Sequence, residues 1–128
     1  MIKNLIVIVL MLLGIGCSNI NFSEEDLHGN WQAVLLTEGQ DTFQYDLKSV
    51  GLNFEQNKRY EYSGNLKNKE AGTYHLLGKI LYTKDTLNSG LEKAVEVVQL
   101  QSDSLRIKMN EAGKIRILEL VRKKKRTY

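Results

Sequence analysis

Side chains that commonly carry out catalysis or bind metals are few in this chain of 128 residues. It has one cysteine, Cys17, and two histidines, His28 and His75, which lie far apart in the sequence. Neither histidine belongs to an HExxH pattern, and the chain has no G-x-S-x-G motif and no glycine-rich phosphate loop. A histidine in a strand-like stretch, as His75 is, more often lies partly exposed than acts as a base. We therefore expect no catalytic residues, no metal site and no cofactor, and hence a protein that is not an enzyme.

Cys17 ends an apolar segment, and this position indicates processing rather than redox chemistry. Residues 5–16 (LIVIVLMLLGIG) form an uncharged run of twelve residues behind Lys3. A transmembrane helix needs about 20 apolar residues, whereas a secretory signal has a shorter apolar stretch closed by small residues. Because the chain has no second cysteine, a disulfide within the chain is excluded. The alternative is a buried thiol, which would require the apolar segment to stay in the fold.

The stretch LLGIGCSN at residues 12–19 resembles the lipobox of bacterial lipoproteins, with Gly14 where that family favours leucine. The resemblance implies that residues 1–16 are a lipoprotein signal peptide and that Cys17 becomes an acylated N-terminus, carrying palmitate-type chains. Several chains on one residue anchor a protein stably, so the membrane is an expected partner. Ser18, in place of the aspartate that holds such proteins in the inner membrane, implies the outer membrane of the cell envelope. Residues 17–26 would then form the acylated N-terminus and a tether.

The positive charge of the chain is concentrated at its C-terminal end. Five of the 18 lysines and arginines form the run RKKKR at residues 122–126, and the 15 acidic residues outnumber the rest. The body therefore has no basic face interleaved with aromatic residues, and we expect no nucleic-acid partner. Two interpretations of the basic tail at residues 123–128 remain open: a solvated end, or a contact with anionic lipid headgroups beside the acyl anchor.

Short alternating runs indicate that the rest of the chain forms β-strands. Val50, Leu52 and Phe54, for example, alternate with polar or small residues, which is typical of a strand with one buried face. Ser23 and Asp26 resemble a capping box, which predicts one helical turn over residues 24–28. Strands are predicted near residues 30–38, 42–47, 50–56, 58–64, 71–77, 79–84, 93–101, 103–110 and 114–122.

Strands joined by hairpins, without crossover helices, predict an all-β fold. An antiparallel meander of about eight strands protects its edges when it closes into a small barrel. Such a barrel is just wide enough to be filled by side chains or to hold one small ligand. Residues 85–92 form the longest break and are predicted at the barrel mouth. Alternation is lost at Val97–Val98 and at Ile117–Leu118, where either a β-bulge or burial of both faces would explain it.

Several motifs along residues 27–122 resemble the lipocalin-like domains of bacterial lipoproteins. Gly29-Asn30-Trp31 opens the first predicted strand, as the G-x-W motif of lipocalins does, and similar matches follow at residues 51–60, 71–74, 104–107 and 120–122. The resemblance implies a small lipocalin-like β-barrel with Trp31 at its closed end. It also implies an arginine stacked on the indole, either Arg122 or, as the alternative, Arg116. Gly29 would permit close backbone approach or a positive φ.

The same resemblance implies that the barrel binds a small apolar or amphipathic ligand. Its interior would be lined by inward-facing residues of neighbouring strands, for which the candidates are Phe54, Tyr60, Tyr62, Tyr74, Tyr82 and Leu105. The alternative for each tyrosine is a cross-strand packing role. Two functions therefore remain: a membrane-anchored lipoprotein that binds a ligand, or a filled barrel that acts as an interaction module or accessory subunit for an envelope protein.

Overall fold

The alternating runs form nine antiparallel strands behind one short helical turn. The computed structural model describes residues 22–42, 46–64 and 68–123, so the predicted signal peptide, Cys17 and the tail beyond Lys123 lie outside the described residues. The elements are η1 (Glu24–Leu27), β1 (Gly29–Glu38), β2 (Asp41–Thr42), β3 (Gly51–Phe54), β4 (Arg59–Ser63), β5 (Lys69–Leu77), β6 (Ile80–Asp85), β7 (Glu92–Leu100), β8 (Ser104–Glu111) and β9 (Lys114–Arg122).

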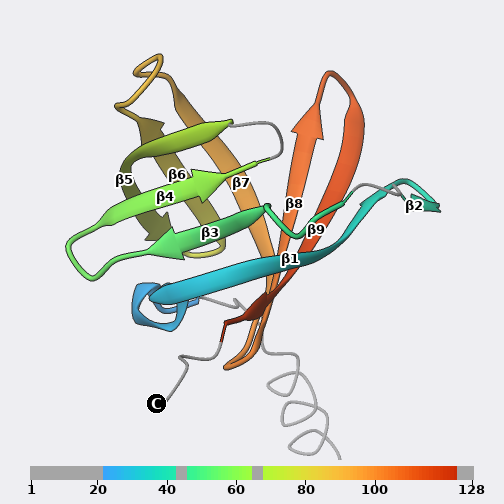
Figure 1. The fold of residues 1–128 in the computed structure, drawn as a ribbon, viewed down its shortest axis with the longest axis horizontal. Coiled ribbons are helices and arrows are strands. Elements are labelled where there is room, and N and C mark those ends of the chain that lie inside the picture. The colour runs from blue at the N-terminus through green and yellow to red at the C-terminus, as the bar shows by residue number, and fades with distance from the viewer. Residues whose placement is uncertain (1–21, 43–45, 65–67, 124–128) are drawn as a thin grey trace, which may run out of the picture.

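Eight of these strands close into a barrel. The sheet order is β2-β1-β3-β4-β5-β6-β7-β8-β9, and an additional pairing of β1 with β9 joins the two sides (Figure 1). The short β2 pairs only with the last two residues of β1, outside the ring. The predicted all-β antiparallel barrel is confirmed.

Two local predictions were wrong. Within the predicted strand at 42–47, Thr42 is strand, Asp46 and Leu47 are not, and residues 43–45 lie outside the described residues. The predicted helical turn is present as a 3-10 helix at Glu24–Leu27, but the predicted capping box is wrong, because Ser23 makes no side-chain cap. The turn is closed by its backbone, since the Ser23 carbonyl accepts the Asp26 N–H at 3.0 Å.

The strand directions define two ends of the barrel. One end, here called the closed end, holds η1, the start of β1, the end of β9 and the turns at 55–58, 78–79 and 101–103. The opposite end, here called the mouth, holds the ends of β1, β4 and β8, the loop at 86–91 and the turn at 112–113. The loop predicted for the mouth therefore lies there.

A bulge in β7 shapes the wall of the barrel. The register with β8 shifts between Val97 and Gln99, so Val98 turns outward and is 41% exposed. At Ile117–Leu118, where a bulge was one of two predicted alternatives, the register is unbroken; the shift in the pairing of β1 with β9 lies between Ala33 and Leu35 of β1, opposite Leu120 and Glu119. β7 and β8 pair only from Glu96–Lys108 to Leu100–Leu105, and they separate towards the mouth (Figure 1).

Candidate functional site

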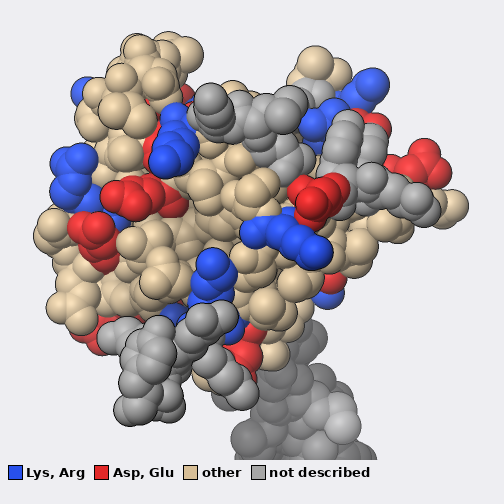
Figure 2. All heavy atoms as spheres, viewed as in Figure 1, with Lys and Arg blue, Asp and Glu red and all other residues tan. Residues whose placement is uncertain are grey.

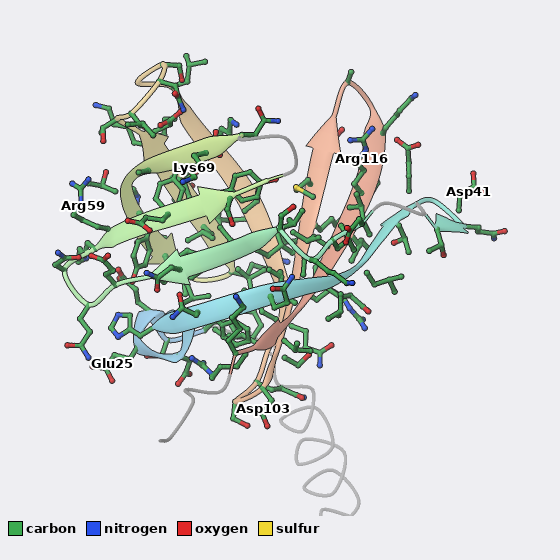
Figure 3. All side chains as sticks on the ribbon, in the orientation of Figure 1. Glu25, Asp41, Arg59, Lys69, Asp103 and Arg116 are labelled. Atoms are coloured by element: carbon green, nitrogen blue, oxygen red, sulfur yellow. The ribbon has the colours of Figure 1, made fainter. Side chains whose placement is uncertain are left out.

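The closed end is built around the only tryptophan of the chain. Trp31 is 1% exposed, and its indole N–H donates to the Leu27 carbonyl of η1 at 2.8 Å. The guanidinium of Arg122 lies over the ring, with its Cζ 4.2 Å from the ring centroid. Arg116, the alternative partner, lies near the mouth, where its Nε is 3.3 Å from Glu38 Oε1. Figure 3 labels Arg116 there and labels Asp103 at the closed end.

Arg122 also ties three segments of the closed end together. Its Nε donates to the Ser102 carbonyl at 2.6 Å, its Nη2 donates to the Asp26 carbonyl at 2.9 Å, and its Nη1 donates to the His28 carbonyl. Gly29 has a φ of +122°, and a Cβ there would lie 2.6 Å from Arg122 Nη1. Both its conformation and its space therefore require glycine. These residues stabilise the closed end.

Four of the six candidate lining residues are packed inside the half of the barrel near the closed end. Phe54, Tyr60, Tyr74 and Leu105 are each at most 3% exposed. The rings of Phe54 and Tyr74 meet edge to face at 4.9 Å, and the Tyr74 hydroxyl donates to the Glu55 carbonyl at 2.8 Å. Burial, with smaller effects from Glu24 and Glu55, raises the pKa of Tyr74 to about 12. These side chains form core rather than an open lining.

Tyr82 lies on the outer face of the barrel, so its predicted inward orientation was wrong. It pairs across the ladder with the exposed His75, and the two rings stack at 4.8 Å with 15° between their planes. Its neighbour Leu81 takes the inward position and is 2% exposed. Because side chains alternate along a strand, Tyr82 must then point outward.

Tyr62, the sixth candidate, belongs to a group of half-buried apolar side chains above the core. This group, here called the apolar belt, consists of Leu36, Leu47, Leu52, Tyr62, Val95 and Met109. Val95 and Met109 lie where β7 and β8 have separated, which is why neither is fully covered. In the sequence these residues appear only as apolar positions of predicted strands. Nothing in the sequence distinguishes a half-buried position from a buried one.

An ion pair crosses the inner wall at the rim of the mouth. Lys93 Nζ of β7 lies 2.8 Å from Glu70 Oε1 of β5, with β6 between them. The hydrogen bond to Glu70 raises the pKa of Lys93, so the ammonium stays charged at neutral pH. Burial, and then the Glu70 carboxylate, raise the pKa of Tyr60.

Asp85 fixes the mouth loop that follows β6. Its carboxylate, 3% exposed as a residue, accepts hydrogen bonds from the backbone N–H groups of Leu87 at 3.0 Å and Asn88 at 3.3 Å. The Asn88 amide donates to Asp85 Oδ2 at 3.1 Å and to the Lys69 carbonyl at 2.7 Å. Burial acts to raise the pKa of Asp85, but these hydrogen bonds outweigh it and lower the pKa. The loop is therefore held at the rim beside β5.

An open hollow of about 710 Å³ lies at this side of the mouth. Its lining residues are Tyr62, Asn68, Lys69, Glu70, Asp85, Leu87, Asn88 and Lys93. Tyr62 is the residue of the apolar belt that lines this hollow, Leu87 is a second apolar residue in its wall, and the remaining lining residues are polar or charged. Polar groups beside an apolar surface suit a ligand with a polar head and an apolar part.

A metal site and a membrane-spanning helix are both absent from the described residues. No group of three or more histidine, cysteine, aspartate or glutamate side chains in residues 22–42, 46–64 and 68–123 could hold a metal ion. Across the same ranges, no helix is both long enough and apolar enough to pass through a membrane.

Comparison with known proteins identifies the fold. No family model matches the chain, and a search of curated proteins found no match. Among solved structures, a lipocalin-like protein from Bacteroides uniformis matches with a TM-score of 0.56 and 23% identity, over 77% of this chain and 99% of that one. An uncharacterized protein from Bacteroides eggerthii matches with a TM-score of 0.51 and 15% identity, over 73% and 98% of the two chains. The chain therefore has the fold of a lipocalin-like β-barrel.

Proposed function

We propose that this protein is a membrane-anchored, lipocalin-like lipoprotein that binds a small apolar or amphipathic ligand at the mouth of its barrel. The observation that carries the proposal is the apolar belt, whose side chains face inward but remain only half-buried above a filled core. Water-exposed apolar surface inside a rim of charged groups favours an occupant that covers it.

The dimensions of the mouth limit the ligand. The hollow of about 710 Å³ lies within the range of small-molecule sites, roughly 300–1,000 Å³. Because the half near the closed end is filled, only a short chain or a ring fits below the rim. Burial of about 150 Å² of apolar surface would contribute about 4 kcal/mol. The polar head would lie beside the Lys93–Glu70 pair.

The chain ends support an anchor at the closed end. The backbone N–H of Phe22 donates to the Gly78 carbonyl in a closed-end turn at 3.1 Å, and Lys123 N–H donates to the Asn30 carbonyl at 2.9 Å. Cys17 lies five residues before Phe22, which corresponds to at most about 18 Å of extended chain. An acylated Cys17 would therefore hold the closed end towards the membrane and leave the mouth accessible.

The filled half of the barrel favours a second function, in which the protein acts as an interaction module or accessory subunit without a ligand. A thermal-shift screen of fatty acids, haem, sterols and small aromatic molecules separates the two. A ligand that binds the folded state raises the melting temperature increasingly with its concentration. If the melting temperature is unchanged by every compound, the ligand-binding function is refuted and the accessory function is supported.

A further inference from the structure

The outer wall of the barrel carries a second group of polar side chains. The ladder of β1, β3, β4 and β5 places Asn30, Asn53, Glu61 and Ala71 in one cross-strand row. Gly51, Ser63 and Lys69 form the next row on the same face. The alternate residues Leu52 and Tyr62 point inward to the apolar belt, so the side chains of the two rows lie on the opposite face of the sheet from that belt.

A hollow of about 380 Å³ lies over these rows. Its lining also includes Trp31, Leu52, Tyr62 and Glu70, and it adjoins the hollow at the mouth, with which it shares Tyr62, Lys69, Glu70 and Leu87. Gly51 and Ala71 lower its floor because they carry little or no side chain. Leu87 and Lys123 stand at its sides, and the loop that carries Leu87 is held by hydrogen bonds from Thr86 N–H at 2.9 Å and Leu87 N–H at 3.2 Å to the Ala71 carbonyl. Figure 2 views the molecule from the side of β1, β3 and β4, where basic and acidic side chains surround an uncharged centre.

Six polar side chains around this hollow have no hydrogen-bond or ion-pair partner within residues 22–42, 46–64 and 68–123: Asn30, Asn53, Glu61, Ser63, Lys69 and Lys123. Some other charges on the outer wall are paired, as Lys79 with Glu96 at 3.1 Å and Arg106 with Glu119. The rim of the mouth is likewise satisfied by Lys93–Glu70 and Asp85–Asn88.

We propose that this outer hollow binds a small hydroxyl-rich molecule with one negative charge, of the class of acidic monosaccharides. The two amides and the serine hydroxyl both donate and accept hydrogen bonds, as sugar hydroxyls require, and Glu61 accepts further ones. Of the charged residues that line the hollow, Glu70 is paired with Lys93, so Lys69 and Lys123 outnumber the single unpaired carboxylate of Glu61 and favour a carboxylate on the ligand. The volume lies at the small end of ligand sites, which suits one sugar ring rather than a chain.

The test is a titration of the full chain with glucuronate, galacturonate and uncharged glucose, followed by calorimetry. The proposal predicts binding of at least one uronate, at least tenfold more tightly than glucose. Asn53→Leu and Lys69→Gln should each weaken that binding at least tenfold. Matched controls on the same face but outside the hollow are Thr73→Leu and Lys84→Gln, and these should leave it unchanged.

Three results would overturn the proposal. The first is no binding of either uronate up to about 10 mM, since a weaker site would provide less than about 3 kcal/mol. The second is equal affinity for glucose and the uronates, because the lysines would then have no role. The third is undiminished binding by Asn53→Leu and Lys69→Gln, which would place the sugar elsewhere. Asn53 lines only the outer hollow, whereas Lys69 also lines the hollow at the mouth, so Asn53→Leu is the variant that distinguishes failure of this proposal from failure of the ligand site at the mouth.

Discussion

Replacement of Trp31 with alanine should remove the structural centre of the closed end. The side chain is 1% exposed, so its loss costs the usual penalty for a large buried aromatic residue, about 3–5 kcal/mol. The substitution also removes the donor to the Leu27 carbonyl and the ring beneath Arg122, a contact worth about 0.5–2 kcal/mol within that range. A domain of this size is stable by only about 5–15 kcal/mol, so a large part of the folding free energy is at stake.

Urea unfolding followed by far-UV circular dichroism measures this loss without relying on tryptophan fluorescence. Trp31→Phe separates the two contributions, because it keeps a ring but leaves the buried Leu27 carbonyl without its donor, at a cost of about 1–3 kcal/mol. Tyr82→Ala is the control, since that ring lies on the outer face, and it should cost less than either. A loss below about 1 kcal/mol for Trp31→Ala would refute the account of the closed end.

Three further predictions concern pH and the two chain ends. The folded-state pKa of Tyr74 is raised from 10.0 to about 12, so its contribution to stability is complete below pH 10 and is lost as the pH rises towards about 12. The urea midpoint of wild type should therefore fall more between pH 9 and pH 11 than that of Tyr74→Phe. Equal falls in the two proteins would contradict the burial of this hydroxyl. Cys17→Ser should abolish incorporation of a tagged fatty acid in metabolic labelling, and label retained on this variant would exclude Cys17 as the acylation site. Truncation after Arg122 should weaken binding of the non-acylated chain to anionic vesicles at low salt, by about 1 kcal/mol for each basic residue removed that lies near the surface, whereas unchanged and salt-insensitive binding would show that the tail is only solvated.

Most strands could be predicted because their apolar and polar residues alternate clearly along the sequence. The arrangement of the closed end could be predicted because Gly29-Asn30-Trp31 resembles the G-x-W motif of lipocalins. Gly29, Trp31 and Arg122 come together from the two ends of the domain, and the resemblance to lipocalin-like domains names all three. Nothing local in the sequence would have joined β1 to the end of β9.

The inward or outward phase of a strand was harder to predict than its existence. β6 (ILYTKD) has apolar residues in both phases, so its composition does not tell whether Leu81 or Tyr82 faces the core. The register with β5 decides this, because Tyr82 pairs with the exposed His75. A strand with mixed phases is thus resolved only by its neighbour.

Both hollows were beyond sequence reasoning for a similar reason. The apolar belt is only half-buried because β7 and β8 separate near the mouth, and the extent of their pairing is a property of the folded barrel. The outer hollow arises because Gly51 and Ala71, on strands that are not neighbours in the sheet, lie on the same face beside the loop of Leu87. Because Gly51 and Ala71 are far apart in the sequence, no motif along the chain indicates that they lie on the same face of the barrel.

The most direct test of ligand binding at the mouth is native mass spectrometry of the gently purified protein and of two tryptophan variants. Val95→Trp would fill the apolar belt, whereas Val98→Trp on the same strand adds an equal volume at a position that is 41% exposed and turned outward. Ligand binding at the mouth predicts an added mass on wild type and on Val98→Trp, and none on folded Val95→Trp. An added mass that persists on Val95→Trp, or bare protein in all three, would contradict it.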